Sequence, residues 1–139
     1  MLKIIPPYDF VQIVKEQSVH EYLGVSKWDI KRWVIVGGYV GNEVSAILRN
    51  YPNCEITIFE CSKRYAEALT KKFLKELRVT IIEKAVSDKS GSVDFFETNL
   101  PGSGSVLNVG ELAEKIYGMK QAENFSVEAI TLDEALKGI

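Results

Sequence analysis

The chain has 139 residues, 46% of them hydrophobic and 26% charged, and its formal net charge is −2. Its length suits one globular domain with its own core. The 17 basic residues are scattered among 19 acidic ones, which argues against nucleic acid as a partner. No apolar run is long enough to span a membrane, and no stretch has the form of a signal peptide. We therefore expect a cytoplasmic protein with no membrane partner.

The two cysteines, Cys54 and Cys61, flank one predicted strand. Their spacing fits neither a C-x-x-C redox pair nor a zinc cluster. We expect two free thiols in a reducing compartment and no metal site.

The first thirty residues are predicted to be an N-terminal helical extension of a single, partial domain that spans residues 1–139. Apolar residues recur at helical spacing from Phe10 to Leu23, and Gly24 is placed to end that helix. His20 lies on the same helix, where a lone histidine is expected to be structural or exposed.

The next fifty residues alternate strands with helices. The sequence RWVIVGG (32–38) is apolar without alternation, which predicts a strand buried on both faces at the centre of a parallel sheet. Strands are also predicted over 56–60 and 79–83, with helices over 43–51 and 63–77 between them. This order predicts an α/β fold with parallel strands, right-handed crossovers and helices on both faces of the sheet.

The second of these helices has a predicted cap and a predicted buried stripe. Ser62 stands where an N-cap residue belongs. Ala66, Leu69, Phe73 and Leu77 recur at helical spacing and form one apolar stripe.

After Lys84 the pattern changes to a β-rich extension. A turn in SDKSG precedes an alternating strand in VDFFE (93–97), and a glycine- and serine-rich loop over 99–105 follows. Ser103 and Ser105 lie in this loop, which either closes over a ligand or serves as a flexible linker. A short helix, a strand and a capping box led by Thr131 and answered by Glu134 are then predicted in ELAEKIYGM, SVEAITL and TLDE.

The turn after the first strand bears on the choice of cofactor. A dinucleotide-binding turn has the form G-x-G-x-x-G, and counting back from Gly38 and Gly41 places Val36 where the first glycine belongs. No Walker lysine follows. The remaining G-x-x-x-G turn, which starts at Gly37, is followed by Glu60 at the end of the second strand, where it can accept hydrogen bonds from both ribose hydroxyls. This combination suits S-adenosylmethionine, although glycines in such a turn also serve packing alone.

Five blocks, in order, resemble the FkbM family of S-adenosylmethionine-dependent methyltransferases over roughly residues 30–137. The blocks are the glycine turn in VIVGGYVGNEVSAIL, the acid in ITIFECSKRYAEALTKKF, the A-V-S-D segment of VTIIEKAVSDKSGSVDFFET, the serine loop and ITLDEAL. The resemblance implies a Rossmann-like class I methyltransferase sheet and O-methylation of a sugar or other small metabolite. It places Gly37, Gly38, Tyr39 and Gly41 around the methionine part of the cofactor, Glu60 on the ribose, Cys61 beside it, and Glu83, Lys84 and Ala85 near the adenine.

The chain departs from the family at three places. Ile35 replaces an acid that normally helps hold the cofactor's amino group, so we expect weaker binding, and Tyr39 replaces an asparagine. Cys61 replaces a proline, which is a milder change. The second half of the family's sheet has no counterpart, so the sheet is expected to be truncated after its third strand.

This truncation would leave one edge of the strand over 32–38 bare and apolar. We expect the chain to be a fragment of a longer polypeptide, a homodimer or partner-bound chain covered at that edge, or a chain in which LKII, VDFFE or SVEAITL fills the gap. A competing hypothesis is a non-catalytic domain, either a degenerate cofactor binder or an assembly module that pairs through this edge. A nicotinamide-binding fragment is a third.

The sequence does not identify a catalytic residue. Four side chains are candidates for a general base toward a small-molecule acceptor, and each also fits a structural or solvent-facing role. They are His20, Tyr39, Asp88 and Asp94.

Overall fold

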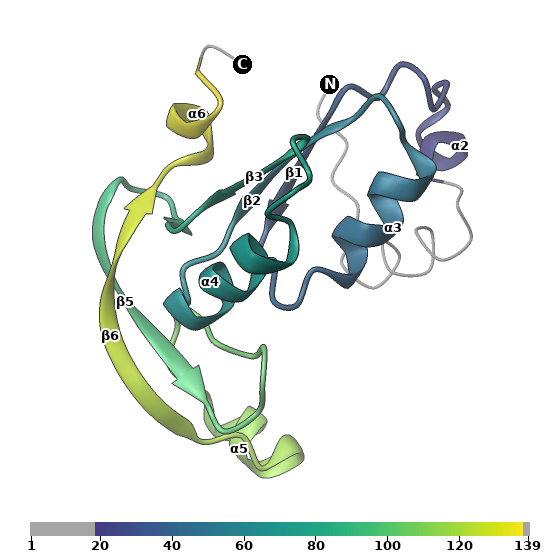
Figure 1. Cartoon of the computed structure of the whole chain (residues 1–139). Helices are drawn as coiled ribbons and strands as arrows, with labels where there is room; N and C mark the ends of the chain where they lie inside the picture. Colours follow the sequence, from purple (N-terminus) through teal and green to yellow (C-terminus); the bar gives the residue numbers. More distant parts are fainter. Residues whose placement is uncertain (1–18, 138–139) are drawn as a thin grey trace.

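The computed structural model describes residues 19–137 as a mixed α/β fold with two three-stranded sheets (Figure 1). The first sheet is parallel, with the order β1-β2-β3, and the second has the order β4-β6-β5. The strands are β1 (Arg32–Val36), β2 (Glu55–Phe59), β3 (Val79–Ile82), β4 (Ala85–Val86), β5 (Gly91–Thr98) and β6 (Gln121–Ile130). The helices are α2 (Val19–Leu23), α3 (Asn42–Asn50), α4 (Lys63–Lys72), α5 (Glu111–Tyr117) and α6 (Leu132–Ala135).

The predicted alternation of strands and helices between residues 32 and 83 is confirmed, as is the β-rich extension. Of the predicted N-terminal helix, only the last turn, α2, falls within the described residues, and the rest lies outside them. None of the described helices is both long and apolar enough to cross a membrane.

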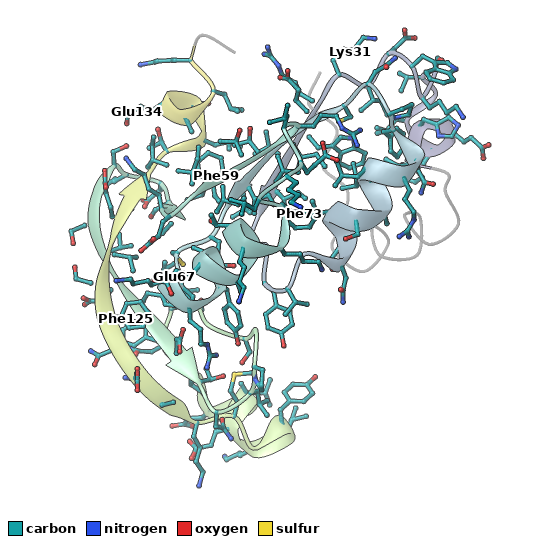
Figure 2. All side chains as sticks on the ribbon, in the orientation of Figure 1. Lys31, Phe59, Glu67, Phe73, Phe125 and Glu134 are labelled. Atoms are coloured by element: carbon teal, nitrogen blue, oxygen red, sulfur yellow. The ribbon has the colours of Figure 1, made fainter. Side chains whose placement is uncertain are left out.

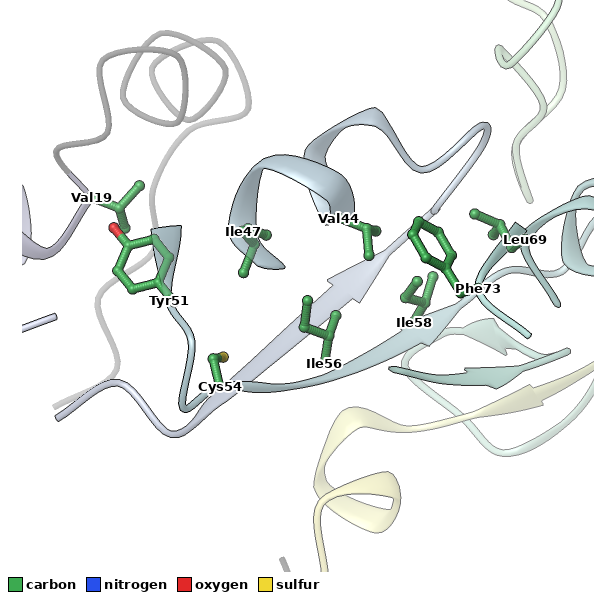
Figure 3. Close-up of a cluster of buried hydrophobic side chains, with 9 residues drawn as sticks. All are labelled: Val19, Val44, Ile47, Tyr51, Cys54, Ile56, Ile58, Leu69 and Phe73. Carbon is green, nitrogen blue, oxygen red and sulfur yellow. The ribbon is translucent and has the colours of Figure 1, made fainter. Parts of the chain in front are cut away.

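Helices α3 and α4 cover one face of the parallel sheet. Ile56 and Ile58 of β2 form a buried cluster with side chains of both helices (Figure 3). Two crossovers of the same hand that step in the same direction along a sheet place their helices on the same side. For the described residues, the prediction of helices on both faces is therefore wrong. The cluster consists of Val19, Val44, Ile47, Tyr51, Cys54, Ile56, Ile58, Leu69 and Phe73.

β1 is an edge strand within the described part of the chain. It pairs with β2 alone, in a parallel register that runs from Arg32↔Glu55 to Val36↔Phe59. Val34 and Val36 are 36% and 58% exposed, so the predicted burial of both faces is wrong. The strand has one neighbour instead of two, and only its alternate side chains pack toward the helices.

The second sheet leaves the outer edge of β1 unfilled. VDFFE and SVEAITL fall mainly in β5 and β6, which pair with each other in an antiparallel ribbon. The rings of Phe95 and Phe125 lie opposite each other in this ribbon, with centroids 5.5 Å apart, and Figure 2 labels Phe125 on β6. Of the segments proposed to fill the gap, only LKII is left, and it lies outside the described residues.

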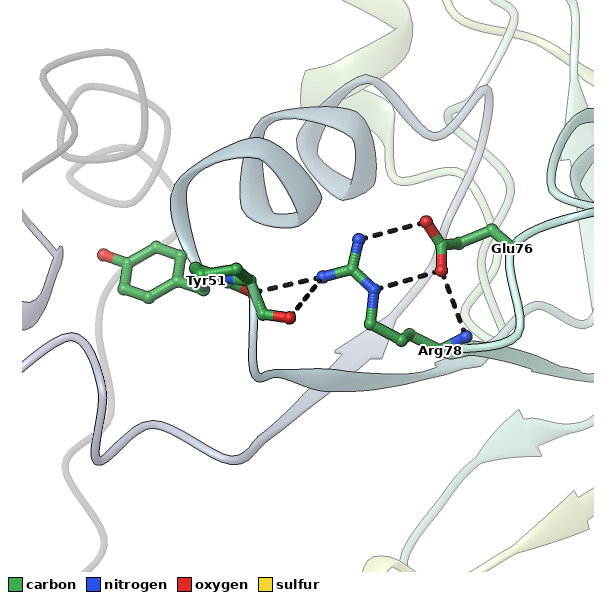
Figure 4. A network of polar contacts seen from close by, with 4 residues as sticks. Tyr51, Glu76 and Arg78 are labelled. Carbon is green, nitrogen blue, oxygen red and sulfur yellow. Dashed lines mark hydrogen bonds and ion pairs between the residues drawn. The ribbon is translucent and has the colours of Figure 1, made fainter.

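Arg78 ties together the loops at the amino-terminal end of the parallel sheet. Its guanidinium donates to the carbonyl oxygens of Tyr51 (3.3 Å) and Pro52 (3.0 Å) and to both carboxylate oxygens of Glu76 (3.0 Å each) (Figure 4). The hydrogen bonds that Arg78 donates to Glu76 lower the pKa of that carboxylate. The Tyr51 hydroxyl accepts a bond from the backbone N–H of His20 (3.2 Å), so His20 anchors α2 at the end of the sheet where the strands begin.

Helix α4 ends five residues earlier than predicted. Its last helical residue is Lys72, after which the chain turns towards β3. Ala66, Leu69 and Phe73 of the predicted stripe are buried, but Leu77 is 98% exposed. The stripe therefore stops at Phe73, because the turn directs Leu77 away from the core.

The two predicted caps are each correct in part. Thr131 precedes α6 and its hydroxyl accepts a bond from the Glu134 backbone N–H (3.2 Å), as predicted. The Glu134 carboxylate does not complete the box, because it accepts from the Ser90 hydroxyl, which in turn accepts from the Thr131 N–H. Ser62 occupies the N-cap position of α4, but its hydroxyl binds Glu97 instead of the helix backbone.

Because α4 ends at Lys72, substitutions of two leucines in the predicted apolar stripe should affect the free energy of unfolding to very different extents. Leu69→Ala should lower the free energy of unfolding by about 2–5 kcal/mol, because it removes a fully buried side chain. Leu77→Ser should change it by less than about 0.5 kcal/mol, because Leu77 lies in solvent. Urea unfolding followed by circular dichroism measures both. A large loss with Leu77→Ser would mean that α4 continues to residue 77.

Candidate functional site

A cavity of about 260 Å³ opens where the strands of the parallel sheet end. Gly37 and Glu60 contribute to it from the residues that follow β1 and β2, and Lys84 contributes from the residues after β3. The opposite wall comes from the end of β5 and the loop that follows it, up to Val106. Ligands of open α/β sheets bind at this carboxyl end of the strands.

The Glu60 carboxylate holds the turn that follows β1. One oxygen, Oε2, accepts the backbone N–H groups of Gly38 and Tyr39, each at 3.0 Å. The other oxygen, Oε1, accepts the N–H of Ser62 at 2.9 Å. Glu60 is 6% exposed, and a buried carboxylate is tolerated only when hydrogen bonds replace its lost hydration. Glu60 thus connects the turns after β1 and β2.

The three glycines of the turn have different roles. A Cβ at Gly38 would lie 2.5 Å from Ile58 and 2.7 Å from Leu69, so Gly38 lets the turn approach the core. Gly41 has φ +72 and faces Leu69 and Phe73 in the same way. Gly37 has φ +81, has nothing within 4 Å of its Cβ position and lines the cavity. Gly37 is therefore the glycine that would let a ligand approach the backbone.

Tyr39 is the only described non-glycine residue with a positive φ, at +44. Its ring stands edge-on to that of Tyr65, with centroids 4.8 Å apart, and both rings line the cavity. A Cβ at Gly102 would lie 2.9 Å from the Tyr39 ring, so the loop after β5 packs directly on this side chain. This contact connects the turn after β1 with the opposite wall of the cavity.

The loop over 99–105 is a wall of the cavity and not a linker. Ser105 and Phe96 exchange backbone hydrogen bonds of 2.7 and 3.0 Å, which folds the loop back on β5. The Ser103 hydroxyl bonds to Thr98 and to the Leu100 carbonyl. These bonds hold the loop against the strand from which it starts.

Cys61 lies in the cavity as a neutral thiol. Burial raises its pKa to about 11, and the nearby Glu60 and Glu97 carboxylates add to the increase by repelling the thiolate. At neutral pH Cys61 is therefore a poor nucleophile. Burial also raises the pKa of Cys54 to about 11, and both thiols are free, as predicted.

The cations of the cavity already have partners, whereas one of its carboxylates has no ion-pair partner among the described residues. The Arg64 guanidinium lies over the Tyr65 ring and donates to its hydroxyl (2.6 Å). Lys84 pairs with Glu128 at 2.5 Å. Glu97 accepts the Ser62 hydroxyl at 2.6 Å, and within residues 19–137 it has no ion-pair partner. Its second carboxylate oxygen has no hydrogen-bond partner among the described residues.

The structure brings six of the nine predicted cofactor-binding residues to the cavity. The other three are Gly38 and Gly41, which face the core, and Glu83, which is exposed outside the cavity. The six are Gly37, Tyr39, Glu60, Cys61, Lys84 and Ala85.

Only one of the four candidate bases, Tyr39, lines the cavity. His20 binds Tyr51 at the other end of the sheet. Asp88 and Asp94 are exposed and lie outside the cavity.

The cavity also contains Ser62, Phe95 and Glu97, which no sequence motif marks as parts of a site. Phe95 and Glu97 both line the cavity, as residues two apart on one face of β5 do. The available signal was an acid on the apolar face of the alternating strand VDFFE. Its position facing the cavity could not be deduced from the sequence, because it depends on where β5 lies against the other sheet.

No protein-family model matches this chain, and a search of curated proteins finds no match either.

The contacts of Glu60 predict a structural cost for losing its charge. Glu60→Gln leaves one acceptor oxygen and places an NH₂ group against buried backbone donors, so we expect a loss of about 1–3 kcal/mol in the free energy of unfolding. Glu67→Gln, the same change at an exposed position of α4, should stay within about 0.5 kcal/mol. Chemical denaturation of both variants measures the difference. Equal stabilities of the two variants would contradict a stabilising role for the hydrogen bonds of Glu60.

Proposed function

We propose that this chain is a Rossmann-like, S-adenosylmethionine-binding domain of methyltransferase type, similar to the FkbM family, that methylates an oxygen of a sugar or other small metabolite. The observation that carries the proposal is the cavity at the carboxyl ends of β1, β2 and β3, where Gly37 opens one side and Glu60 lies buried between the first two strand ends.

The acceptor capacity of Glu60 supports a ribose at this place. A carboxylate has about four lone-pair positions, and the three backbone bonds leave about one of them, on Oε1. Glu60 can therefore take one ribose hydroxyl while it still holds the turn. The sequence had suggested that Glu60 binds both hydroxyls, and the count of bonds favours a single one.

The size of the cavity limits it to one small ligand. Its volume of about 260 Å³ lies just below the range for small-molecule sites, which begins at roughly 300 Å³. S-adenosylmethionine would supply a methyl group that its sulfonium already activates, so the protein mainly has to align the reactants. Ile35 packs toward the core, which leaves the end of β1 without the carboxylate that the family uses for the cofactor's amino group.

A test of this proposal requires a variant that leaves the three backbone hydrogen bonds of Glu60 intact. Gly37→Ala adds a methyl group in the cavity, and Gly24→Ala adds the same group outside it. Both residues have a positive φ (+81 and +67) and nothing within 4 Å of the Cβ position. Each change should therefore cost a similar 1–2 kcal/mol or so of stability.

Isothermal titration calorimetry should detect micromolar binding of S-adenosylmethionine and S-adenosylhomocysteine, but not of NADH. Gly37→Ala should weaken this binding by about tenfold or more, because the added methyl group occupies ligand space. Gly24→Ala should leave it unchanged. Absence of heat with both adenosyl ligands would overturn the proposal.

A second candidate function, assembly through an exposed sheet edge, is favoured by one observation. Within the described residues β1 has a neighbour on one side only, and Val34 and Val36 are exposed on it. Such an edge offers unpaired backbone groups to another strand. We propose that two copies of the chain pair there.

Val34→Lys should convert this dimer to a monomer, because a charge on an edge strand opposes strand addition. Leu77→Lys, at another exposed apolar residue, should leave the molar mass of the dimer in solution unchanged. Light scattering coupled to gel filtration measures both. A monomeric wild-type chain would contradict pairing.

A further inference from the structure

We propose that Glu97 selects adenine by accepting a hydrogen bond from its exocyclic amine. This inference rests on the proposed function and names a specificity-determining residue within the same cavity. Glu97 and Phe95 extend into the cavity from the same face of β5, so the wall that they form offers an aromatic ring and a hydrogen-bond acceptor side by side.

The bonds of Glu60 establish an order along the cavity. Its Oε2 faces the turn at Gly38 and Tyr39, and its Oε1 faces Ser62. The Ser62 hydroxyl in turn binds Glu97. A ligand with its ribose at Glu60 and its amino-acid part at the turn after β1 therefore extends its base towards Ser62 and Glu97.

The chemistry of Glu97 suits an amine and not a carbonyl. A carboxylate accepts hydrogen bonds and donates none. One oxygen accepts the Ser62 hydroxyl at 2.6 Å, and the other has no hydrogen-bond partner among residues 19–137. The 6-amino group of adenine donates two hydrogens, whereas the 6-oxo group of hypoxanthine would meet the carboxylate with a second acceptor.

The surroundings of Glu97 argue that it is not placed there for stability. Its direct cross-strand partner in the β5–β6 ribbon is Glu123, and like charges that face each other on neighbouring strands are destabilising. No described cation pairs with Glu97. A residue that conflicts with its local surroundings is expected at a functional site.

The test compares S-adenosylhomocysteine with S-inosylhomocysteine, in which a 6-oxo group replaces the 6-amino group of the base and N1 carries a hydrogen. The wild-type chain should bind the adenosyl compound tighter by on the order of tenfold or more, since the inosyl compound leaves two acceptors opposed. Glu97→Gln should reduce this ratio to near one, because a carboxamide can rotate to donate to the 6-oxo group. Glu123→Gln removes the same like-charge contact outside the cavity and should keep the wild-type ratio.

The possible outcomes distinguish a failure of the role of Glu97 from a failure of the proposed adenosine-cofactor binding. If the wild-type chain binds neither compound, the proposed function fails, and the role of Glu97 fails with it. If it binds both compounds equally, or if Glu97→Gln weakens both by the same factor, the role of Glu97 is overturned while adenosine binding stands. Circular dichroism of each variant checks that the fold is kept.

Discussion

The carboxylate of Glu60 is the interaction on which the arrangement of the cavity depends. It stands at the end of β2 and accepts three backbone N–H groups, two from the turn after β1 and one from the start of α4. A parallel sheet brings these segments to one end, but its backbone ladder reaches only to Gly37, whose N–H donates to the Phe59 carbonyl (2.8 Å), and not to the rest of the turn or to α4. The buried charge joins them, and it is stabilised there by the same N–H groups.

The opposite wall depends on two close approaches between glycines and rings. Gly102 lies on the Tyr39 ring, and Gly104 lies on the Phe95 ring, where a Cβ would be 2.4 Å away. Any side chain at either position would push the loop away from the cavity. Because Tyr39 is itself part of the turn that Glu60 holds, the two walls are coupled through one backbone segment. A substitution at Gly102 in the loop should therefore also disturb the turn that follows β1.

Within the described residues, helices α3 and α4 cover one face of the parallel sheet, and the other face of the edge strand β1 is left exposed. Both crossovers step from β1 towards β3, so their helices share one face. Ile56 and Ile58 are buried there, while Val34 and Val36 of the edge strand remain exposed. The second sheet contributes to the cavity but does not extend the first one, since no strand of one sheet pairs with a strand of the other within residues 19–137.

The sequence by itself determined the order of strands and helices, the α/β class, the glycine turn and the acid after β2, because these follow from hydrophobic period and turn chemistry within a few residues. It could not determine which face of β1 is covered, where α4 stops or what the hydroxyl of Ser62 binds. Those features depend on segments far apart in the chain, as Ser62 and Glu97 are. Tertiary structure alone decided that Gly38 and Gly41 serve packing while Gly37 faces the cavity, because a glycine's role depends on what lies opposite its missing side chain.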